Sequence, residues 1–129
     1  MAAYLYIAAG GALGSIARYW MAGAIDGRLN TNFPWGTVLV NITGSFAIGI
    51  FAALATGDGR WGISESTRLF LIVGICGGFT TFSSFSLQTL NLLREGLLLR
   101  AGGHIALSVI ACVVATWAGL ALMQMLGKN

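Results

Sequence analysis

Residues 74–89 read GICGGFTTFSSFSLQT and lie inside an apolar stretch of 27 residues, Thr67–Leu93. A straight helix rises about 1.5 Å per residue, so this stretch would be about 40 Å long, whereas the hydrocarbon core of a bilayer is about 30 Å thick. Either a tilt or a break can absorb the difference. Glycine weakens a helix, and hydroxyl groups can satisfy the backbone groups that a break frees. The pair Gly77–Gly78, followed by five Ser or Thr within nine residues, therefore predicts a helix that opens near the middle of its span.

The glycines of this stretch allow a second interpretation. Gly74 and Gly78 form a GxxxG pair, as do Gly10 and Gly14, and this spacing is typical of membrane helices that pack closely. In a broken helix, by contrast, unwound carbonyl groups can hold a bare cation such as Na⁺. Spacing alone favours packing, and it leaves the ion site open.

The composition places the whole chain in a membrane. Of its 129 residues, 57 % are hydrophobic and 9 % are charged, and the mean hydropathy is +0.82, whereas soluble domains carry about 25 % charged residues. An ordinary soluble enzyme, a disordered chain and a disulfide-stapled secreted domain are thereby excluded. Stretches of about 20 apolar residues can span a bilayer. We predict an all-α membrane protein with a single domain, residues 1–129, and four spans at about 3–25, 35–56, 67–93 and 101–126.

The basic residues select neither side of the membrane. Four spans put both termini on one side, and the basic residues then divide three against three: Arg60, Arg68 and Lys128 against Arg28, Arg94 and Arg100. Arg18 makes the count three against four at most. Since an excess of Lys and Arg sets orientation, two hypotheses remain. The chain inserts both ways up and pairs with an inverted copy, or one weak bias fixes a single topology. The scattered charges form no basic patch, so no nucleic-acid partner is expected.

Polar and aromatic residues inside the spans need partners or a function. Asn41 in the second span either bonds neighbouring helices or lines a polar path. Phe79, Phe82 and Phe85 recur every third residue and either pack or present their positive ring edges to an anion. In the second case, hydroxyl donors would lie alongside them on the interleaved residues Thr81, Ser83, Ser84 and Ser86.

The fourth span carries a polar stripe, with residues spaced four apart along one side of a helix: His104, Ser108, Cys112 and Thr116. Such a stripe suits a hydrated path or a seam between helices. The sequence has no metal-ligand spacing of His, Cys, Asp and Glu, and no nucleophile–base arrangement, so the chain is not expected to be an enzyme.

The positions of the acidic residues also discriminate between functions. All four lie in loops or at span edges: Asp26, Asp58, Glu65 and Glu95. A proton-coupled exporter needs a membrane-embedded acid, and a cation channel is expected to use carboxylates or a carbonyl filter. The spans offer amide, hydroxyl and ring-edge donors with one arginine, and donors suit an anion.

Three motifs resemble the Fluc-type fluoride channels of bacteria. They are Gly14-Ser15-x-x-Arg18-Tyr19, Gly36-Thr37-x-x-Val40-Asn41-x-x-Gly44, and the run GGFTTFSSFS at residues 77–86. Chain length, number of spans and loop sizes agree as well, so the resemblance covers the whole chain. It implies a dual-topology homodimer in the bacterial inner membrane, with two antiparallel pores that draw on both subunits.

The resemblance also implies roles for individual residues. The backbone carbonyls of Gly77 and Thr80 would hold a buried structural Na⁺ on the two-fold axis. The ring edges of Phe82 and Phe85 would line the fluoride path, with Asn41 bonding near them. The remaining positions carried over are a hydroxyl of the polar track along the fourth span and an arginine near the pore vestibule: Ser108 and Arg18.

Three positions depart from the family's usual residues. Gln88 stands where the family often has Glu, Cys112 where it has Ser or Thr, and His104 where some members have Tyr. Gln88 still donates and accepts, whereas a thiol is a poorer donor than a hydroxyl. The implied function is passive, selective export of fluoride from the cytoplasm. The alternatives are a small dual-topology multidrug/proton antiporter, which needs a buried acid that this sequence lacks, and a non-conducting assembly subunit.

Overall fold

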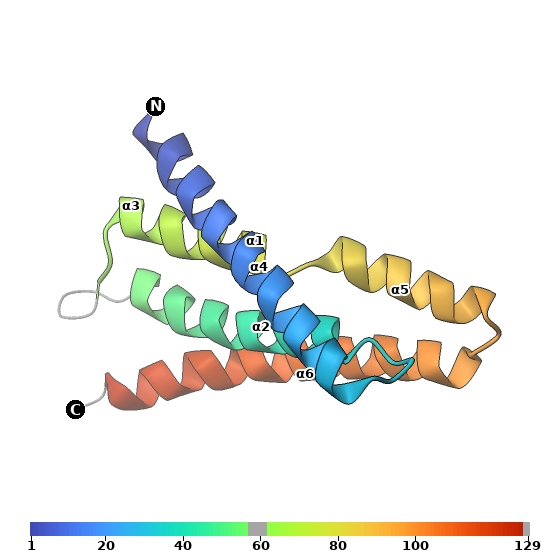
Figure 1. Cartoon of the computed structure of the whole chain (residues 1–129). Helices are drawn as coiled ribbons and strands as arrows, with labels where there is room; N and C mark the ends of the chain where they lie inside the picture. Colours follow the sequence, from blue (N-terminus) through green and yellow to red (C-terminus); the bar gives the residue numbers. More distant parts are fainter. Residues whose placement is uncertain (57–61, 128–129) are drawn as a thin grey trace.

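The computed structural model describes residues 1–56 and 62–127, and these residues form helices and connecting turns without a strand. Figure 1 shows a slanted first helix lying across a layer of nearly parallel helices. The elements in chain order are α1 (Ala2–Leu29), α2 (Trp35–Thr56), α3 (Glu65–Arg68), the π-helix η1 (Leu69–Cys76), α4 (Gly77–Phe79), α5 (Phe82–Arg94) and α6 (Leu98–Leu126).

The helix bounds agree closely with the predicted spans. The second span, 35–56, matches α2 at both ends, and the third and fourth, at 67–93 and 101–126, correspond to Glu65–Arg94 and Leu98–Leu126. Within the described residues these three segments are long and apolar enough to cross a membrane. The first predicted span, 3–25, lies in α1 of 28 residues. Its glycines, tyrosines and Arg18 lower its hydropathy, so its place as a fourth span stays a prediction.

The third span is broken, as its length and glycines predict, but the break lies further along the chain. Gly77 and Gly78 remain helical in α4, and the backbone becomes extended at Thr80 (φ −81°, ψ 155°) and Thr81 (φ −149°, ψ 112°). The opening therefore lies near the middle of the span, as predicted, but two residues beyond Gly78 rather than at the glycine pair. Thr81 can cap the next helix with its hydroxyl, which glycine cannot. The π-helical turn of Leu69–Cys76 was not predicted.

Both predicted GxxxG pairs lie where α1 crosses the third span. A Cβ on Gly10 would overlap the Phe70 carbonyl and lie 2.9 Å from the Gly74 Cα, and a Cβ on Gly14 would overlap the Ile75 carbonyl. On the other side, a Cβ on Gly78 would lie 2.5 Å from the Gly11 carbonyl oxygen. The two backbones approach so closely that only glycine fits, which confirms the packing interpretation of both pairs.

A second glycine crossing joins α2 and α6, which lie side by side in Figure 1 and run in the same direction. A Cβ on Gly49 would overlap the Thr116 carbonyl, and a Cβ on Gly119 would overlap the Phe46 carbonyl. Val38, Val40 and Ala101 are fully buried in this part of the chain. The α2–α6 pair thus forms the base on which the broken third span lies.

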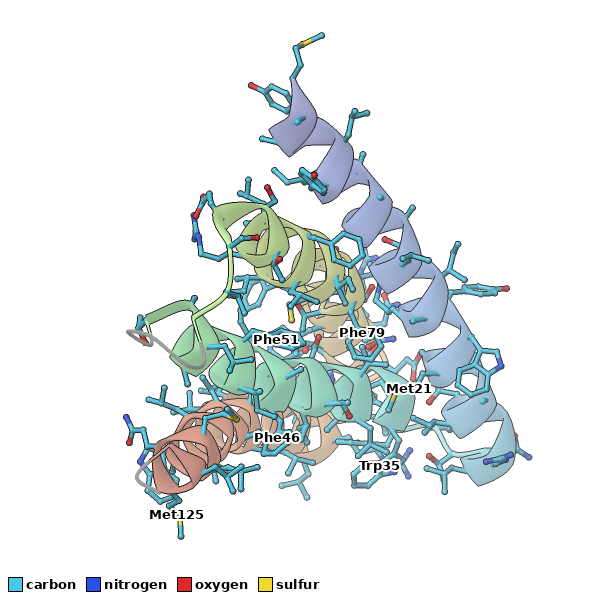
Figure 2. The ribbon with its side chains drawn as sticks, turned by 90° about the vertical axis from the view of Figure 1, so that its left-hand side faces the viewer. Met21, Trp35, Phe46, Phe51, Phe79 and Met125 are labelled. Atoms are coloured by element: carbon cyan, nitrogen blue, oxygen red, sulfur yellow. The ribbon has the colours of Figure 1, made fainter. Side chains whose placement is uncertain are left out.

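Much of the outer surface is apolar. Figure 2 shows Met125 pointing away from the bundle, whereas Phe79 lies among the helices. Exposed large side chains occur on α1, α5 and α6, among them Trp20, Leu99 and Trp117. This surface is typical of a protein whose surroundings are lipid or another apolar partner. Arg60 and Lys128, which entered the charge count, lie outside the described residues, as does Asp58.

Candidate functional site

The break in the third span is held by its own side chains. The amide and the hydroxyl of Thr80 both donate to the Cys76 carbonyl, at 2.9 and 2.8 Å, and so close the end of α4. The Thr81 hydroxyl accepts a hydrogen bond from the Ser84 amide at 3.2 Å and so caps the start of α5. A helix start leaves amides without intrahelical partners, and an N-cap threonine satisfies one of them. The sequence Thr-Thr therefore ends one helix and begins the next.

Asn41 on α2 fixes the break from the opposite side. Its side-chain amide nitrogen donates to the Thr81 carbonyl at 3.1 Å, and its carbonyl oxygen accepts the Thr81 amide at 2.8 Å. One side chain thus bonds to both polar backbone groups of a non-helical residue, whose amide would otherwise be unpaired in an apolar environment. Of the two roles that the sequence left open for Asn41, the bonding role is present in the structure.

Arg18 on α1 also bonds to the break. Its Nε donates to the Gly78 carbonyl at 3.2 Å, and the Ser15 hydroxyl reaches the same oxygen at 3.5 Å. The carbonyl groups at a helix C-terminus carry partial negative charge, and a cation there is favourable. Arg18 therefore caps the first half of the broken span, in addition to any effect that its charge has on an anion.

A cavity of about 360 Å³ lies between α2, α5 and α6, beside the break, and we call it the phenylalanine cavity. Its lining includes most of the predicted path residues, Asn41, Thr81, Phe82, Phe85, Ser108 and Cys112, together with the predicted Na⁺ ligand Thr80. The rings of Phe82 and Phe85 are 5.2 Å apart at an interplanar angle of 42°. The Ser108 hydroxyl is buried, with no hydrogen-bond partner among the described residues. The cavity lining contains no carboxylate.

The phenylalanine cavity is open on one side. Phe82 forms part of its rim and is 77 % exposed in the single chain. Phe85, by contrast, is only partly exposed and lies with its ring against His104. One chain therefore supplies only part of a wall around this space.

A second cavity, of about 560 Å³, lies between α1, α2 and α5, and we call it the arginine cavity. Its lining includes four predicted site residues: Arg18, Thr81, Ser84 and Gln88. Thr81 borders both cavities. The two cavities therefore lie on either side of the break in the third span. The Gln88 Oε1 atom is buried and has no partner among the described residues. The position of Arg18 on this cavity is consistent with the predicted place of the arginine near a pore vestibule.

Not all predicted path residues border these cavities. Ser83 is exposed, with its hydroxyl 3.3 Å from that of Thr81. His104 is fully buried behind Phe85. Gly77, a predicted Na⁺ ligand, is exposed in the single chain. The stripe on the fourth span is thus divided: Ser108 and Cys112 border a cavity, whereas His104 and Thr116 lie at seams between helices.

Asp26 is a functional candidate that the sequence reasoning assigned only to a loop. It lies in the last turn of α1, and its Oδ1 accepts the Gly36 amide at 2.7 Å. A carboxylate at a helix N-terminus is favourable because the amides there are unpaired. The sequence signal that could have indicated this contact is the position of Asp26 ten residues before Gly36, across a short loop that contains proline. Asp26 borders the arginine cavity and a third cavity of about 470 Å³, which Gln88 and Glu95 also line.

The chain is similar to known proteins over almost its whole length. A family model described as "CrcB-like protein, Camphor Resistance (CrcB)" matches residues 5–120. A curated protein of Methylocella silvestris named "Fluoride-specific ion channel FluC" is 55 % identical over 128 residues, which are 96 % of this chain and 98 % of that protein. Proteins with the same name from Rhodospirillum rubrum and Opitutus terrae are 54 % and 53 % identical, each covering at least 90 % of both chains.

These matches extend over nearly all of the helical segments described above. The family model includes the break, Asn41, Arg18 and the polar residues of α6. The names of the relatives confirm the resemblance that the three motifs indicated. The chain therefore belongs to the CrcB-like protein family.

Proposed function

We propose that this chain is a fluoride-specific ion channel through which fluoride leaves the cytoplasm passively. The observation that carries the proposal is the phenylalanine cavity, in which two aromatic rings, a buried hydroxyl and the broken backbone of the third span meet. The family and the relatives named as fluoride-specific channels support it independently. A channel transforms no substrate, so the chain is not an enzyme.

The chemistry of the cavity suits a small anion. Fluoride is strongly hydrated, so a path through the membrane must replace its water with other donors. The Ser108 hydroxyl supplies an O–H, and phenylalanine ring edges carry partial positive charge. None of these donors has a full charge, so the anion is bound weakly enough to leave, as conduction requires.

The membrane potential supplies the driving force. Hydrogen fluoride crosses lipid as a neutral acid and ionises in a less acidic cytoplasm, where the anion is trapped. An inside-negative potential favours exit of an anion by about 2.3 kcal/mol per charge for each 100 mV. Such a channel needs no coupling ion and no buried acid. The side chains that line the phenylalanine cavity agree with that requirement.

We further propose that the working unit is a homodimer of two inverted copies with two pores. The open side of the phenylalanine cavity and the exposed ring of Phe82 support a partner that completes the wall. The balanced basic residues support insertion in both orientations. In this arrangement α1 is the fourth span, both termini lie on one side, and the surrounding phase is the lipid of the bacterial inner membrane.

A structural Na⁺ at the dimer centre fits the residues present. No hydrogen bond from the described residues reaches the carbonyl oxygens of Gly77 and Thr80, and unwound carbonyls of this kind are suitable Na⁺ ligands. The Gly77 face is open, since the nearest atom to a Cβ there would be the Ile72 carbonyl oxygen at 4.0 Å. Two carbonyls are too few for a cation, so an inverted copy would supply the matching pair. The ion would neutralise carbonyl dipoles between the subunits.

The decisive experiment measures ion efflux from liposomes that contain the purified protein. We expect rapid efflux of fluoride, little efflux of chloride, and loss of the dimer or of efflux when Na⁺ is replaced by a large organic cation. A multidrug antiporter would instead exchange protons in response to drugs. An assembly subunit would give no flux. Absence of fluoride efflux from a well-folded dimer would refute the channel proposal.

Dual insertion is tested separately with a reporter fused to the C-terminus. If the chain inserts both ways up, the reporter is detected on both sides of the membrane in the same cells. A signal confined to one side would contradict dual topology, but it would leave the fluoride efflux result unaffected.

A further inference from the structure

His104 is the most deeply buried polar side chain that the proposed path does not use. It is 0 % exposed and borders none of the three cavities. Its ring lies 5.0 Å from that of Phe85 and, on another side, meets the ring of Phe33 in a T-shaped contact at 5.7 Å. A histidine that contacts two phenylalanine rings restricts their positions, because the interior is close-packed.

The hydrogen bonds of His104 also lead to Phe85. Its Nδ1 lies 2.9 Å from the Thr89 hydroxyl, and this hydroxyl donates to the Phe85 backbone carbonyl at 2.8 Å. Thr89 has one hydroxyl proton, and a carbonyl oxygen can only accept. When both bonds form together, the Thr89 proton lies toward the Phe85 carbonyl, and the proton between His104 and Thr89 belongs to Nδ1. The chain of donation runs from His104 through Thr89 to the carbonyl of Phe85.

From these contacts we infer that His104 is a positioning residue that fixes Phe85 at the phenylalanine cavity, through the ring on one side and through Thr89 and the carbonyl on the other. This inference rests on the proposed channel function only for its effect on flux. It assigns His104 no contact with the ion. It also explains why His104, which its four-residue spacing from Ser108 assigns to the polar stripe, is buried behind Phe85 instead of lining the path.

The assigned proton predicts a tautomer that can be measured directly. His104 is the only histidine of the chain, so protein labelled with ¹⁵N-histidine gives one pair of ring-nitrogen signals, from Nδ1 and Nε2 of this residue. We expect Nδ1 protonated and Nε2 bare, which is the less common form of neutral imidazole in water. The variant Thr89→Val removes the acceptor and should release the proton to Nε2, whereas Thr89→Ser keeps the hydroxyl and should retain it on Nδ1.

The position of Phe85 is read from a fluorine label. With 4-fluorophenylalanine in place of Phe85, His104→Leu should shift and broaden the ¹⁹F signal, and Thr89→Val should do the same to a smaller extent. The matched control carries the label in place of Phe46 on α2, whose signal should not change. His104→Asn keeps a donor at the place of Nδ1 without the ring, so it separates the hydrogen-bond contribution from the ring contact.

Fluoride efflux tests the consequence. Loss of one hydrogen bond corresponds to at most about a tenfold change in rate, so we expect His104→Leu and Thr89→Val each to lower the maximal efflux rate by up to that factor. The double variant should lose no more than the worse single variant, and Thr89→Ser should restore the rate. An Nε2-protonated imidazole in the native protein, or an unchanged ¹⁹F signal at position 85 in His104→Leu, would overturn the inference. Because both spectra are recorded without flux, their failure is distinct from failure of the channel proposal.

Discussion

The third span contains two neighbouring regions whose backbones are stabilised in different ways. At Gly74 and Gly78 it lies against α1 so closely that a single Cβ would overlap or press on backbone atoms. At Thr80 and Thr81 it is extended, and side chains from other parts of the chain satisfy it. The first region is held by shape and the second by hydrogen bonds. Glycine at the crossing thus fixes where the helix lies, and this leaves the threonines free to determine where it opens.

The glycine crossing should be the more sensitive region to substitution. In Gly14→Ala the new Cβ would overlap the Ile75 carbonyl and lie 2.9 Å from the Phe79 amide nitrogen. Both are backbone atoms, which cannot rotate away, so we expect a loss of about 3 kcal/mol of stability. Thermal unfolding of the purified protein in detergent measures it. The control Gly23→Ala lies on the same helix with nothing within 4 Å of the Cβ, and it should be neutral or slightly stabilising. Equal losses in the two variants would show that packing is not the cause.

The hydrogen-bonded region depends most on Asn41. The variant Asn41→Leu leaves the amide of Thr81 unpaired and removes one of the two donors to its carbonyl, so we expect a loss of about 2 kcal/mol together with a marked fall in fluoride efflux. The control Thr43→Val alters an exposed hydroxyl on the same helix that bonds only to the Leu39 carbonyl, at 2.8 Å, and should change neither quantity. Native stability in Asn41→Leu would mean that the break does not need the amide.

Two variants of Arg18 distinguish the effect of its hydrogen bond on stability from the effect of its charge on efflux. The amide nitrogen of glutamine occupies the same place along the side chain as the Nε of arginine, which donates to the Gly78 carbonyl at 3.2 Å. Arg18→Gln should therefore keep native stability, and Arg18→Met should lose about 1 kcal/mol. If the charge also attracts anions, Arg18→Gln should show slower efflux with a weaker dependence on ionic strength. Equal unfolding temperatures for the glutamine and methionine variants would argue against the capping role.

The smallest effect is expected at Cys112, which borders the phenylalanine cavity beside Ser108. A hydroxyl donates better than a thiol, so Cys112→Ser should raise fluoride efflux by about twofold, a change well below the worth of one full hydrogen bond. Cys76→Ala provides the comparison, because Cys76 is buried in η1 and lines no cavity described here. Efflux per folded protein should stay constant in that variant. A lower rate in Cys112→Ser would exclude a donor role at this position.

Much of the fold was accessible from the sequence because the membrane imposes simple rules. The length of an apolar stretch predicts a span, and the bounds of α2 were predicted to the residue. The excess length and the glycines of the third span predicted a break, and the two GxxxG pairs predicted a close crossing. These are local properties, set by the spacing of a few residues along one helix.

The candidate site was only partly accessible. The residues Asn41, Phe82, Phe85 and Ser108 were identified by type and by the family resemblance, and the structure brings them to one cavity. The break lies two residues beyond the predicted glycine pair, since capping by Thr81 and the side-chain amide of Asn41 decide its position. The role of Asp26 at the start of α2 was missed for a similar reason, because its partner is the backbone of another helix.

The sequence by itself determined that the chain is helical and apolar, where its spans lie, and that its interior offers hydrogen-bond donors without buried acid. Only the tertiary structure decided which polar residues face a cavity and which face another helix. His104 and Ser108 are four residues apart on one stripe, yet the first bonds to Thr89 while the second is unpaired at the cavity. Periodicity assigns a residue to a side of a helix, but its partner depends on how closely the neighbouring helices approach.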